Sequence, residues 1–307
     1  MGDLNIVMYH YVREIEGSDF PRIRGLEVSA FSRQLDYLAE KFSFVTERDV
    51  MRALAGEGNL PDDACWLTFD DGYKDHYTYV LPELLSRGIS GSFFVPSKAV
   101  LEEEVLDVHA IQHVLASIKD EQELLEEFSS LCRASGVSRD FTEEMWVAHA
   151  KPNRFDTAGV IYFKRMLQHL LPQPLRSEIT TRLLETVVGL SKDEFSSQLY
   201  LSLSETQQLV SEGMSVGGHT HSHPWLSTLS PEEKLLELEQ SRSFLEMVGM
   251  DGNMWSMAYP YGAYDMDTVT LARSLGCAVA VTTEPKVART EDNPLLLARL
   301  DTNDFRQ

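Results

Sequence analysis

The sequence has few cysteines, no long apolar run and a shortage of positive charge. Its three cysteines, Cys65, Cys132 and Cys277, are widely spaced and form no CxxC pair, so neither a disulfide framework nor a cysteine-ligated zinc site is predicted. No apolar run approaches the roughly 18 residues of a membrane span. The chain does not begin with a basic segment followed by an apolar stretch, so we expect no secretory signal and a cytoplasmic location.

The charge balance argues against some classes of binding partner. The 307 residues include 27 Lys and Arg against 48 Asp and Glu, a formal net charge of −21. Such a negative field repels phosphate backbones and anionic lipid, which argues against nucleic acid as a partner. Hydrophobic residues make up 43% and charged residues 24%, ordinary values for a soluble globular protein. The length suits about two domains, or one α/β barrel with additions.

Short apolar runs that end in polar residues indicate the buried strands of a parallel sheet. Near-continuous apolar runs are typical of strands covered on both faces. Helical patterns alternate with them, which predicts an α/β fold with right-handed crossovers. The predicted strands are residues 5–9, 65–69, 92–95, 214–218, 255–259 and 277–281. The predicted helices begin at the N-cap candidate Ser29, at Thr46, at residue 74, at Ser230 and at residue 265.

One long segment breaks this alternation. From about residue 103 to residue 209 the pattern is helical, with almost no strand signal and few glycines. We therefore interpret residues 1–102 and 210–307 as a barrel and residues 103–209 as a helical insertion. The insertion is either a lid over the barrel mouth or a structural elaboration or dimer surface. The sequence leaves these alternatives open, and with them the formation of a homo-oligomer.

Thr68-Phe69-Asp70-Asp71-Gly72 places two adjacent carboxylates at the end of a predicted buried strand. Like charges repel and burial disfavours both ionised forms, so a bound cation would offset the cost. Adjacent side chains on an extended chain point in different directions, so one carboxylate can bind a metal while its neighbour faces a substrate. The alternative interpretation is a solvated Asp-Asp-Gly turn.

Two further motifs follow later predicted strands. In Gly217–Pro224, His219 and His223 are four residues apart, a spacing that lets two imidazoles converge on one ion. With one carboxylate they make a three-ligand set with open positions, and His221 would then point away. In Tyr259-Pro260-Tyr261-Gly262, the turn would fix the backbone N–H of Tyr261 as an oxyanion donor, although alone it is an ordinary turn. Core packing is the alternative role for a histidine.

These three motifs, in this order and each at a strand end, resemble those of the polysaccharide deacetylases of the NodB-homology type, carbohydrate esterase family four. The resemblance covers about residues 4–102 and 210–303. It implies an α/β fold, a distorted (β/α)7-type barrel with its site at the carboxyl ends of the strands. It also implies the metal-dependent hydrolysis of an N-acyl group, N-acetyl or N-formyl, from an amino sugar or saccharide.

The resemblance further implies residue roles. It makes Asp71, His219 and His223 the metal ligands. Asp70 corresponds to the general base, which acts on a metal-activated water, and Tyr261 to the backbone donor to the oxyanion. The implied cofactor is a divalent metal, with zinc first and cobalt, nickel or iron as alternatives. The implied partner is a carbohydrate or sugar-conjugate substrate.

Two positions depart from the family pattern. The Arg that usually begins the third motif is replaced by Ala258, and Arg299 is the candidate to supply that charge, with a surface ion pair as its alternative role. The family's late general-acid histidine is missing, because no His follows His223. Tyr9-His10 resembles a subgroup in which an N-terminal Tyr-His fills that place, so His10 becomes the candidate acid. The alternative for His10 is a buried strand-end histidine bonded to backbone.

Two other functions remain open from the sequence. One is a C–N hydrolase that acts on a small non-sugar amide or ureide with the same metal chemistry. The other is a barrel that binds sugar without catalysis, which the loss of the motif Arg at Ala258 motivates. Retention of the two motif carboxylates and the two motif histidines argues against this last alternative.

Overall fold

The computed structural model describes residues 2–153 and 156–305, which divide into two compact units. The described residues of the first unit are 2–14, 25–103 and 197–305, and those of the second are 15–24, 104–153 and 156–196. Met1 and residues 306–307, the ends of the predicted barrel, lie outside the described residues. Every residue that the sequence assigned to the site belongs to the first unit.

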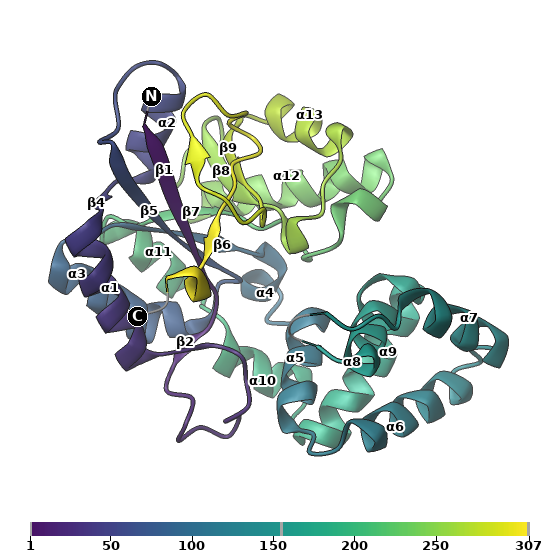
Figure 1. Cartoon of the computed structure of the whole chain (residues 1–307). Helices are drawn as coiled ribbons and strands as arrows, with labels where there is room; N and C mark the ends of the chain where they lie inside the picture. Colours follow the sequence, from purple (N-terminus) through teal and green to yellow (C-terminus); the bar gives the residue numbers. More distant parts are fainter. Residues whose placement is uncertain (1, 154–155, 306–307) are drawn as a thin grey trace. The chain divides into compact units, whose positions relative to one another are not determined.

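The first unit is built on a curled, mostly parallel sheet (Figure 1). In spatial order its strands are β10 (Ala288–Arg289), β1 (Asp3–Tyr9), β5 (Asp63–Asp70), β6 (Gly91–Val95), β7 (Ser215–Gly218), β8 (Trp255–Ala258) and β9 (Cys277–Val281). In addition, β11 (Leu300–Asp301) pairs with β1, and β4 (Ser43–Phe44) pairs with β5. The strands β2 (Val12–Arg13) and β3 (Leu26–Glu27) form a small separate sheet. Among the pairs formed by these strands, only the β1–β10 pair is antiparallel. The six predicted strands and the distorted barrel are confirmed, and the two-residue strands were not predicted.

Both faces of the main sheet are buried, which accounts for its apolar runs. On β5, Trp66 packs in an inner cluster with residues of β1, β6 and β9. Its neighbours Leu67 and Phe69 pack in an outer cluster against the covering helices. All three side chains are fully buried. Because successive residues alternate between two buried faces, the strand carries no polar alternation until it ends at Asp70.

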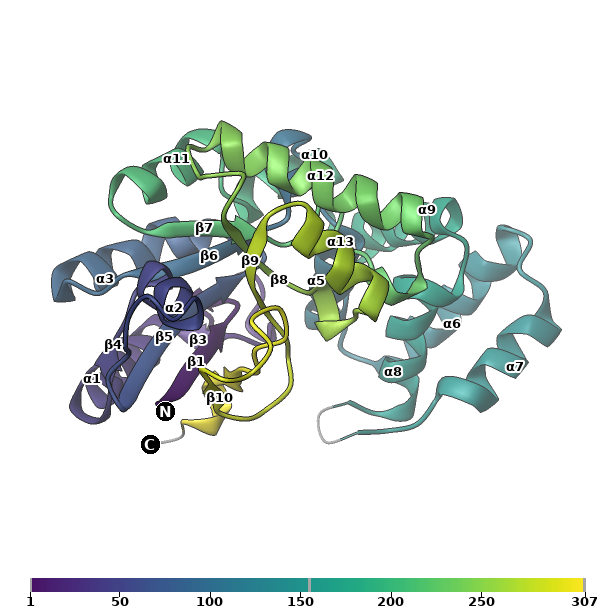
Figure 2. The ribbon, with the colours of Figure 1, turned by 90° about the horizontal axis from the view of Figure 1, so that it is seen from above.

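The helices of the first unit connect these strands. They are α1 (Val28–Lys41), α2 (Glu47–Leu54), α3 (Leu81–Arg87), α4 (Ser97–Leu101), α11 (Leu203–Ser211), α12 (Pro231–Met247) and α13 (Met266–Ser274). A π-helical turn at His76–Val80 leads into α3, and short 3-10 turns lie at Leu226–Thr228, Pro260–Gly262 and Thr302–Asp304. Figure 2 shows α12 along β7, on which it packs.

The helix starts agree with the sequence at two positions and differ at a third. Thr46 and Ser230 begin α2 and α12 with reciprocal capping boxes, as the sequence signals indicated. The predicted N-cap Ser29 is wrong. Because α1 follows β3 directly and starts at Val28, the N-cap position falls on Glu27, which makes no side-chain capping bond.

The second unit is helical. It contains α5 (Asp107–Ser117), α6 (Glu121–Ala134), α7 (Arg139–His149), α8 (Ala158–Arg165) and α9 (Gln173–Leu183), and α10 (Lys192–Leu199) runs from it into the first unit. Π-helical turns lie at Met166–Leu170 and Leu184–Val188. Its boundaries differ from the predicted insertion at residues 103–209, because it ends at Ser196 and also takes in Ile15–Arg24. Arg22 ties that early segment to α5 by donating to the carbonyl of Ala116 at 3.0 Å.

The described helices are too short or too polar to cross a bilayer. The longest of those described is α12, with 17 residues, and seven of these are charged. A transmembrane helix needs about 20 predominantly apolar residues.

Candidate active site

Three side chains with metal-binding atoms meet at the carboxyl edge of the sheet. Asp71 follows β5, and His219 and His223 follow β7. The Nε2 atoms of His219 and His223 lie 3.4 Å and 3.3 Å from Oδ1 of Asp71. The two Nε2 atoms are 3.1 Å apart. All three side chains are buried, so the predicted ligands form one compact, dry cluster.

The spacing of these three atoms fits a single divalent cation. Ligand atoms held about 2.0–2.1 Å from a common ion at tetrahedral angles lie roughly 3.3–3.4 Å from one another. Two imidazole nitrogens and one carboxylate oxygen suit zinc, and also iron, cobalt or nickel. Burial by itself lowers the pKa of His219, but Asp71 and Asp70 raise that pKa above its usual value. The field at the cluster therefore favours positive charge.

Two hydrogen bonds orient the donor atoms. Nδ1 of His219 donates to the carbonyl oxygen of Ala258 at 2.7 Å. Because a carbonyl only accepts, the ring proton sits on Nδ1 and Nε2 keeps its lone pair toward the cluster. The hydroxyl of Tyr73 donates to Oδ2 of Asp71 at 2.8 Å, on the carboxylate oxygen that the histidines do not approach. Partners of this kind fix the tautomer and orientation of metal ligands.

The backbone of the site is strained. Among the described residues, five that are not glycine have positive φ, and four of them belong to the site. The four are Asp71, Thr220, His223 and Tyr261, with φ of 80°, 63°, 59° and 59°. This conformation costs a residue with a side chain roughly 1–2 kcal/mol and persists only where the surrounding structure holds it. Its concentration here marks the motifs as a site whose geometry is maintained against local preference.

The turn between the two histidines is held from both sides. Glu237 on α12 accepts hydrogen bonds from the backbone N–H groups of His221 and Ser222, at 2.8 Å each, and from the Ser222 hydroxyl. In a second set of contacts, Oγ of Ser97 lies 2.9 Å from Nδ1 of His221, whose Nε2 lies 3.2 Å from Oε1 of Glu102. His221 therefore serves the turn and stays out of the metal cluster, as expected.

Asp70 is held by Arg299. The guanidinium binds both carboxylate oxygens, with Nη1 at 2.8 Å from Oδ1 and Nη2 at 2.7 Å from Oδ2. Both side chains are almost fully buried, so Arg299 does not make a surface ion pair. Burial raises the pKa of Asp70, but the charge and hydrogen bonds of Arg299 outweigh it and hold that pKa below its usual value. Arg299 itself is fixed by donating from Nε to the carbonyl of Thr282 at 2.9 Å.

His10 and Tyr261 lie beside these groups. Nε2 of His10 is 4.0 Å from Oδ2 of Asp70, and the His10 side chain is 40% exposed, so it is not a buried histidine. Its backbone carbonyl accepts a hydrogen bond from Nε2 of buried His76 at 2.9 Å. The ring of Tyr261 lies 4.7 Å from that of His223, centroid to centroid. All the residues that the sequence assigned to the site therefore lie along one edge of the barrel.

Comparison with known proteins agrees with the motifs. The family profile described as polysaccharide deacetylase matches residues 189–280. The putative polysaccharide deacetylase YxkH of Bacillus subtilis (strain 168) is 26% identical over 101 residues. This stretch of the chain is therefore similar to polysaccharide deacetylases. This match spans 33% of the chain and 36% of the length of that curated relative.

Solved structures share the fold of this chain over almost its whole length. The Streptococcus pyogenes deacetylase PplD in complex with acetate has a TM-score of 0.59 at 19% identity, covering 97% of this chain and 92% of that one. IcaB from Ammonifex degensii has a TM-score of 0.59 at 20% identity, covering 99% of this chain and 94% of that one. These alignments extend beyond the stretches that carry the sequence motifs.

The structure shows what replaces the arginine that is missing from the third motif at Ala258. Ala258 cannot contact Asp70 as an arginine would, but its carbonyl orients His219. The charge on Asp70 comes from Arg299, which reaches it from the segment just before β11. A cation from a different part of the chain thus occupies the place beside the motif carboxylate.

Three contributors to the site were given no role from the sequence, although Thr68 stands in the first motif. Thr68 accepts a hydrogen bond from Nη1 of Arg299 at 3.2 Å, and Tyr73 and Glu237 make the contacts described above. Thr68 and Tyr73 each stand two residues from a motif carboxylate, and that closeness in sequence could have identified them. Glu237 is one of several acidic residues of α12, and no sequence signal separates it from the others.

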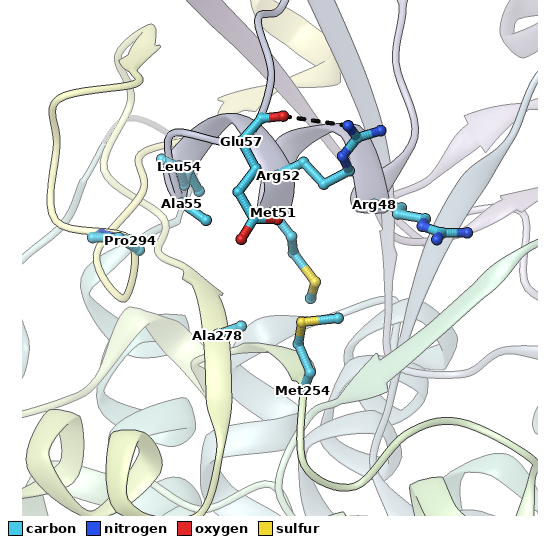
Figure 3. Close-up of a pocket in the computed structure, with 9 residues that line it drawn as sticks. All are labelled: Arg48, Met51, Arg52, Leu54, Ala55, Glu57, Met254, Ala278 and Pro294. Atoms are coloured by element: carbon cyan, nitrogen blue, oxygen red, sulfur yellow. Dashed lines mark hydrogen bonds between the residues drawn. The ribbon is translucent and has the colours of Figure 1, made fainter.

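A pocket of about 400 Å³ lies elsewhere in the first unit, around α2 (Figure 3). Met51 and Met254 point toward one another across it, and Arg52 donates to the carbonyl of Glu57 at 3.2 Å. The residues that line it are Arg48, Met51, Arg52, Leu54, Ala55, Glu57, Met254, Ala278 and Pro294. None of them belongs to the metal cluster. In this protein, buried charge and backbone strain locate the candidate active site better than pocket volume does.

Proposed function

We propose that this protein is a metal-dependent carbohydrate N-deacetylase, which removes an N-acetyl or N-formyl group from an amino sugar or sugar conjugate. The observation that carries the proposal is the buried cluster of Asp71, His219 and His223, set beside an Asp70 carboxylate that Arg299 holds in one orientation. The family match supports it. So does the fold shared with PplD, whose structure is described as a deacetylase in complex with acetate.

In this proposal Asp71, His219 and His223 hold a divalent metal, zinc first. A metal bound there would polarise the acyl carbonyl and lower the pKa of a water molecule. The protein contributes the arrangement, because the carbonyl of Ala258 and the hydroxyl of Tyr73 orient two of the ligands before any metal binds. The dry surroundings strengthen each electrostatic contact.

The remaining side chains would handle the protons. Asp70, kept ionised by Arg299, accepts the proton of the attacking water as its oxygen bonds to the acyl carbon. The backbone N–H of Tyr261 donates to the oxygen that becomes negative. His10, partly exposed and 4.0 Å from Asp70, protonates the amine as the C–N bond breaks, which leaves a free amino sugar and a carboxylic acid.

The test is release of acetate or formate. Purified protein loaded with zinc or cobalt is incubated with N-acetylated and N-formylated amino sugars, their oligomers and nucleotide-linked forms, and both acids and product masses are measured. We expect release from at least one of these substrates. We also expect Asp70→Asn to keep its metal and lose roughly 10²–10⁴-fold in kcat. Release only from small non-sugar amides or ureides, no release from the metal-loaded protein, or full activity in Asp70→Asn would contradict the proposal.

A further inference from the structure

We infer that Tyr73 and Tyr11 form a hydrogen-bonded pair, the tyrosine relay, that positions the Asp71 carboxylate for metal binding. The inference rests on the proposed metal site and adds two positioning residues to it. The motif residues that carry the family resemblance end at Gly72, so they assign no role to either tyrosine.

Tyr73 fixes one oxygen of the carboxylate. Its side chain is fully buried, and its hydroxyl donates to Oδ2 of Asp71 at 2.8 Å. The histidine nitrogens approach the other oxygen, Oδ1, at 3.3–3.4 Å. The hydroxyl therefore holds the carboxylate with one oxygen turned toward the site of the metal.

Tyr11 completes the relay. Its ring stacks on that of Tyr73 with centroids 3.9 Å apart and planes at 18°, and the two side chains are hydrogen bonded. A carboxylate only accepts, so the single hydroxyl proton of Tyr73 is used on Asp71. Tyr11 must then donate to the oxygen of Tyr73, which polarises that hydroxyl and strengthens its bond to Asp71.

Neighbouring side chains pack against both rings of the tyrosine relay. The guanidinium carbon of Arg13 lies 4.7 Å from the centroid of the Tyr11 ring, and Arg13 binds both oxygens of Asp75, at 2.6 Å and 3.0 Å. On the other side, the ring of His76 meets that of Tyr73 edge to face at 5.7 Å. Because Asp71 has a strained backbone with φ of 80°, these packed rings supply an orientation that the backbone does not.

The expected effect is on metal affinity. Removing a partner that orients a metal ligand typically weakens binding by about 10–100-fold. We expect Tyr73→Phe to raise the Kd for Zn²⁺ about tenfold. Tyr11→Phe should raise it by a smaller factor, because Tyr73 can still donate to Asp71 without it.

Tyr9 offers a matched control. It is another buried tyrosine of the same unit, and its ring stacks on that of Phe69 with centroids 5.0 Å apart. Its hydroxyl has no hydrogen-bond partner among the described residues. Tyr9→Phe therefore removes the same atom from the same core without touching Asp71, and it reports any effect that comes from packing alone.

The experiment measures metal binding by the full chain. Metal-free wild type, Tyr73→Phe, Tyr11→Phe and Tyr9→Phe are titrated with Zn²⁺ in competition with a chelator. The absorption spectrum of each Co²⁺ form reports ligand geometry, and the thermal midpoint of each metal-free form reports folding. The expected result is weaker binding and an altered Co²⁺ spectrum for Tyr73→Phe, with Tyr9→Phe equal to wild type.

The possible failures are distinguishable. Wild-type affinity and spectrum in Tyr73→Phe would overturn the relay and leave the metal site standing. Equal weakening in Tyr9→Phe and Tyr73→Phe would show a packing effect and also overturn it. Absence of metal binding by the wild type would overturn both the relay and the proposed function.

Discussion

Two carboxylates are buried in the same barrel toward opposite ends of its strands, and their partners differ. Asp70, at the carboxyl end of β5, meets the guanidinium of Arg299 on both of its oxygens. Glu47 starts α2, and its partners are the hydroxyls of Ser256, at 2.6 Å, and Ser92, near the amino ends of β8 and β6. Both side chains are at most 5% exposed.

The difference shows that the hydrogen-bonding partner determines whether a buried carboxyl is ionised. Burial raises the pKa of Glu47 to about 7, because hydrogen bonds from hydroxyls offset desolvation only in part. Arg299 more than offsets the same penalty at Asp70, whose pKa lies below its usual value. At neutral pH Asp70, at one end of the barrel, is therefore ionised, while Glu47 at the other end is partly protonated.

We expect the largest effect when the guanidinium of Arg299 is removed from Asp70. We expect Arg299→Met to lower the free energy of unfolding by about 3–5 kcal/mol, because it leaves a buried charge without its partner. Activity should fall with it, since Asp70 loses both charge balance and orientation. Urea denaturation and kcat measure the two effects.

Arg289→Met is the matched control for that variant. Arg289 pairs with Asp3 at 3.7 Å, and both side chains are 63% exposed. An exposed pair contributes about 1 kcal/mol or less. Comparable losses of stability in the two variants would contradict the special status given to the Asp70–Arg299 pair.

The raised pKa of Glu47 predicts how the stability of the protein depends on pH. The pKa of Glu47 is raised in the folded state, so the folded protein keeps a proton that the unfolded chain loses. The free energy of unfolding therefore falls as the pH rises from about 4.5 toward 7. Above pH 7 the loss is constant at about 3 kcal/mol. Glu47→Gln cannot ionise, so relative to wild type it should gain stability across this window.

Urea denaturation at several pH values between 4 and 8 checks the Glu47 prediction. Glu239→Gln, at an exposed position on α12, serves as the reference substitution. A Glu47→Gln variant whose stability parallels wild type at every pH would show that the buried carboxyl ionises as easily as it does in the unfolded chain.

A third carboxylate, Glu237, should give the smallest effect. It is only partly buried and acts through the turn between the metal ligands, accepting from the N–H groups of His221 and Ser222. In Glu237→Gln one oxygen becomes an amide that cannot accept. We expect a loss of about 1–2 kcal/mol in stability of the turn, seen as roughly tenfold weaker Zn²⁺ binding. Unchanged binding, as expected of Glu239→Gln, would assign Glu237 no part in holding the site.

The strands and the main site residues could be predicted because their signals are local. Trp66 and its neighbours form an apolar run that ends at Asp70 and Asp71, and the run exists because both faces of β5 are buried. Since parallel strands end at one edge, the prediction that His219 would approach Asp71 needed only their order.

Other features could not be predicted, because they depend on the assembled fold. Glu237 is 14 residues beyond His223 on a helix with many acids, and only the packing of α12 on β7 brings it to the turn. The segment Ile15–Arg24 belongs with the helical unit through contacts such as Arg22 with Ala116, some ninety residues away. The two-residue strands are shorter than any pattern of alternation.

The most direct test of the central claim is the number of metal ions bound per chain. Isothermal titration of the metal-free protein with Zn²⁺ should give one tight site in the wild type. The same titration should show that site lost in His219→Ala and in Asp71→Ala, and retained in His221→Ala. No stoichiometric binding by the wild type, or an unaltered site in His219→Ala, would contradict the claim that Asp71, His219 and His223 hold one divalent metal.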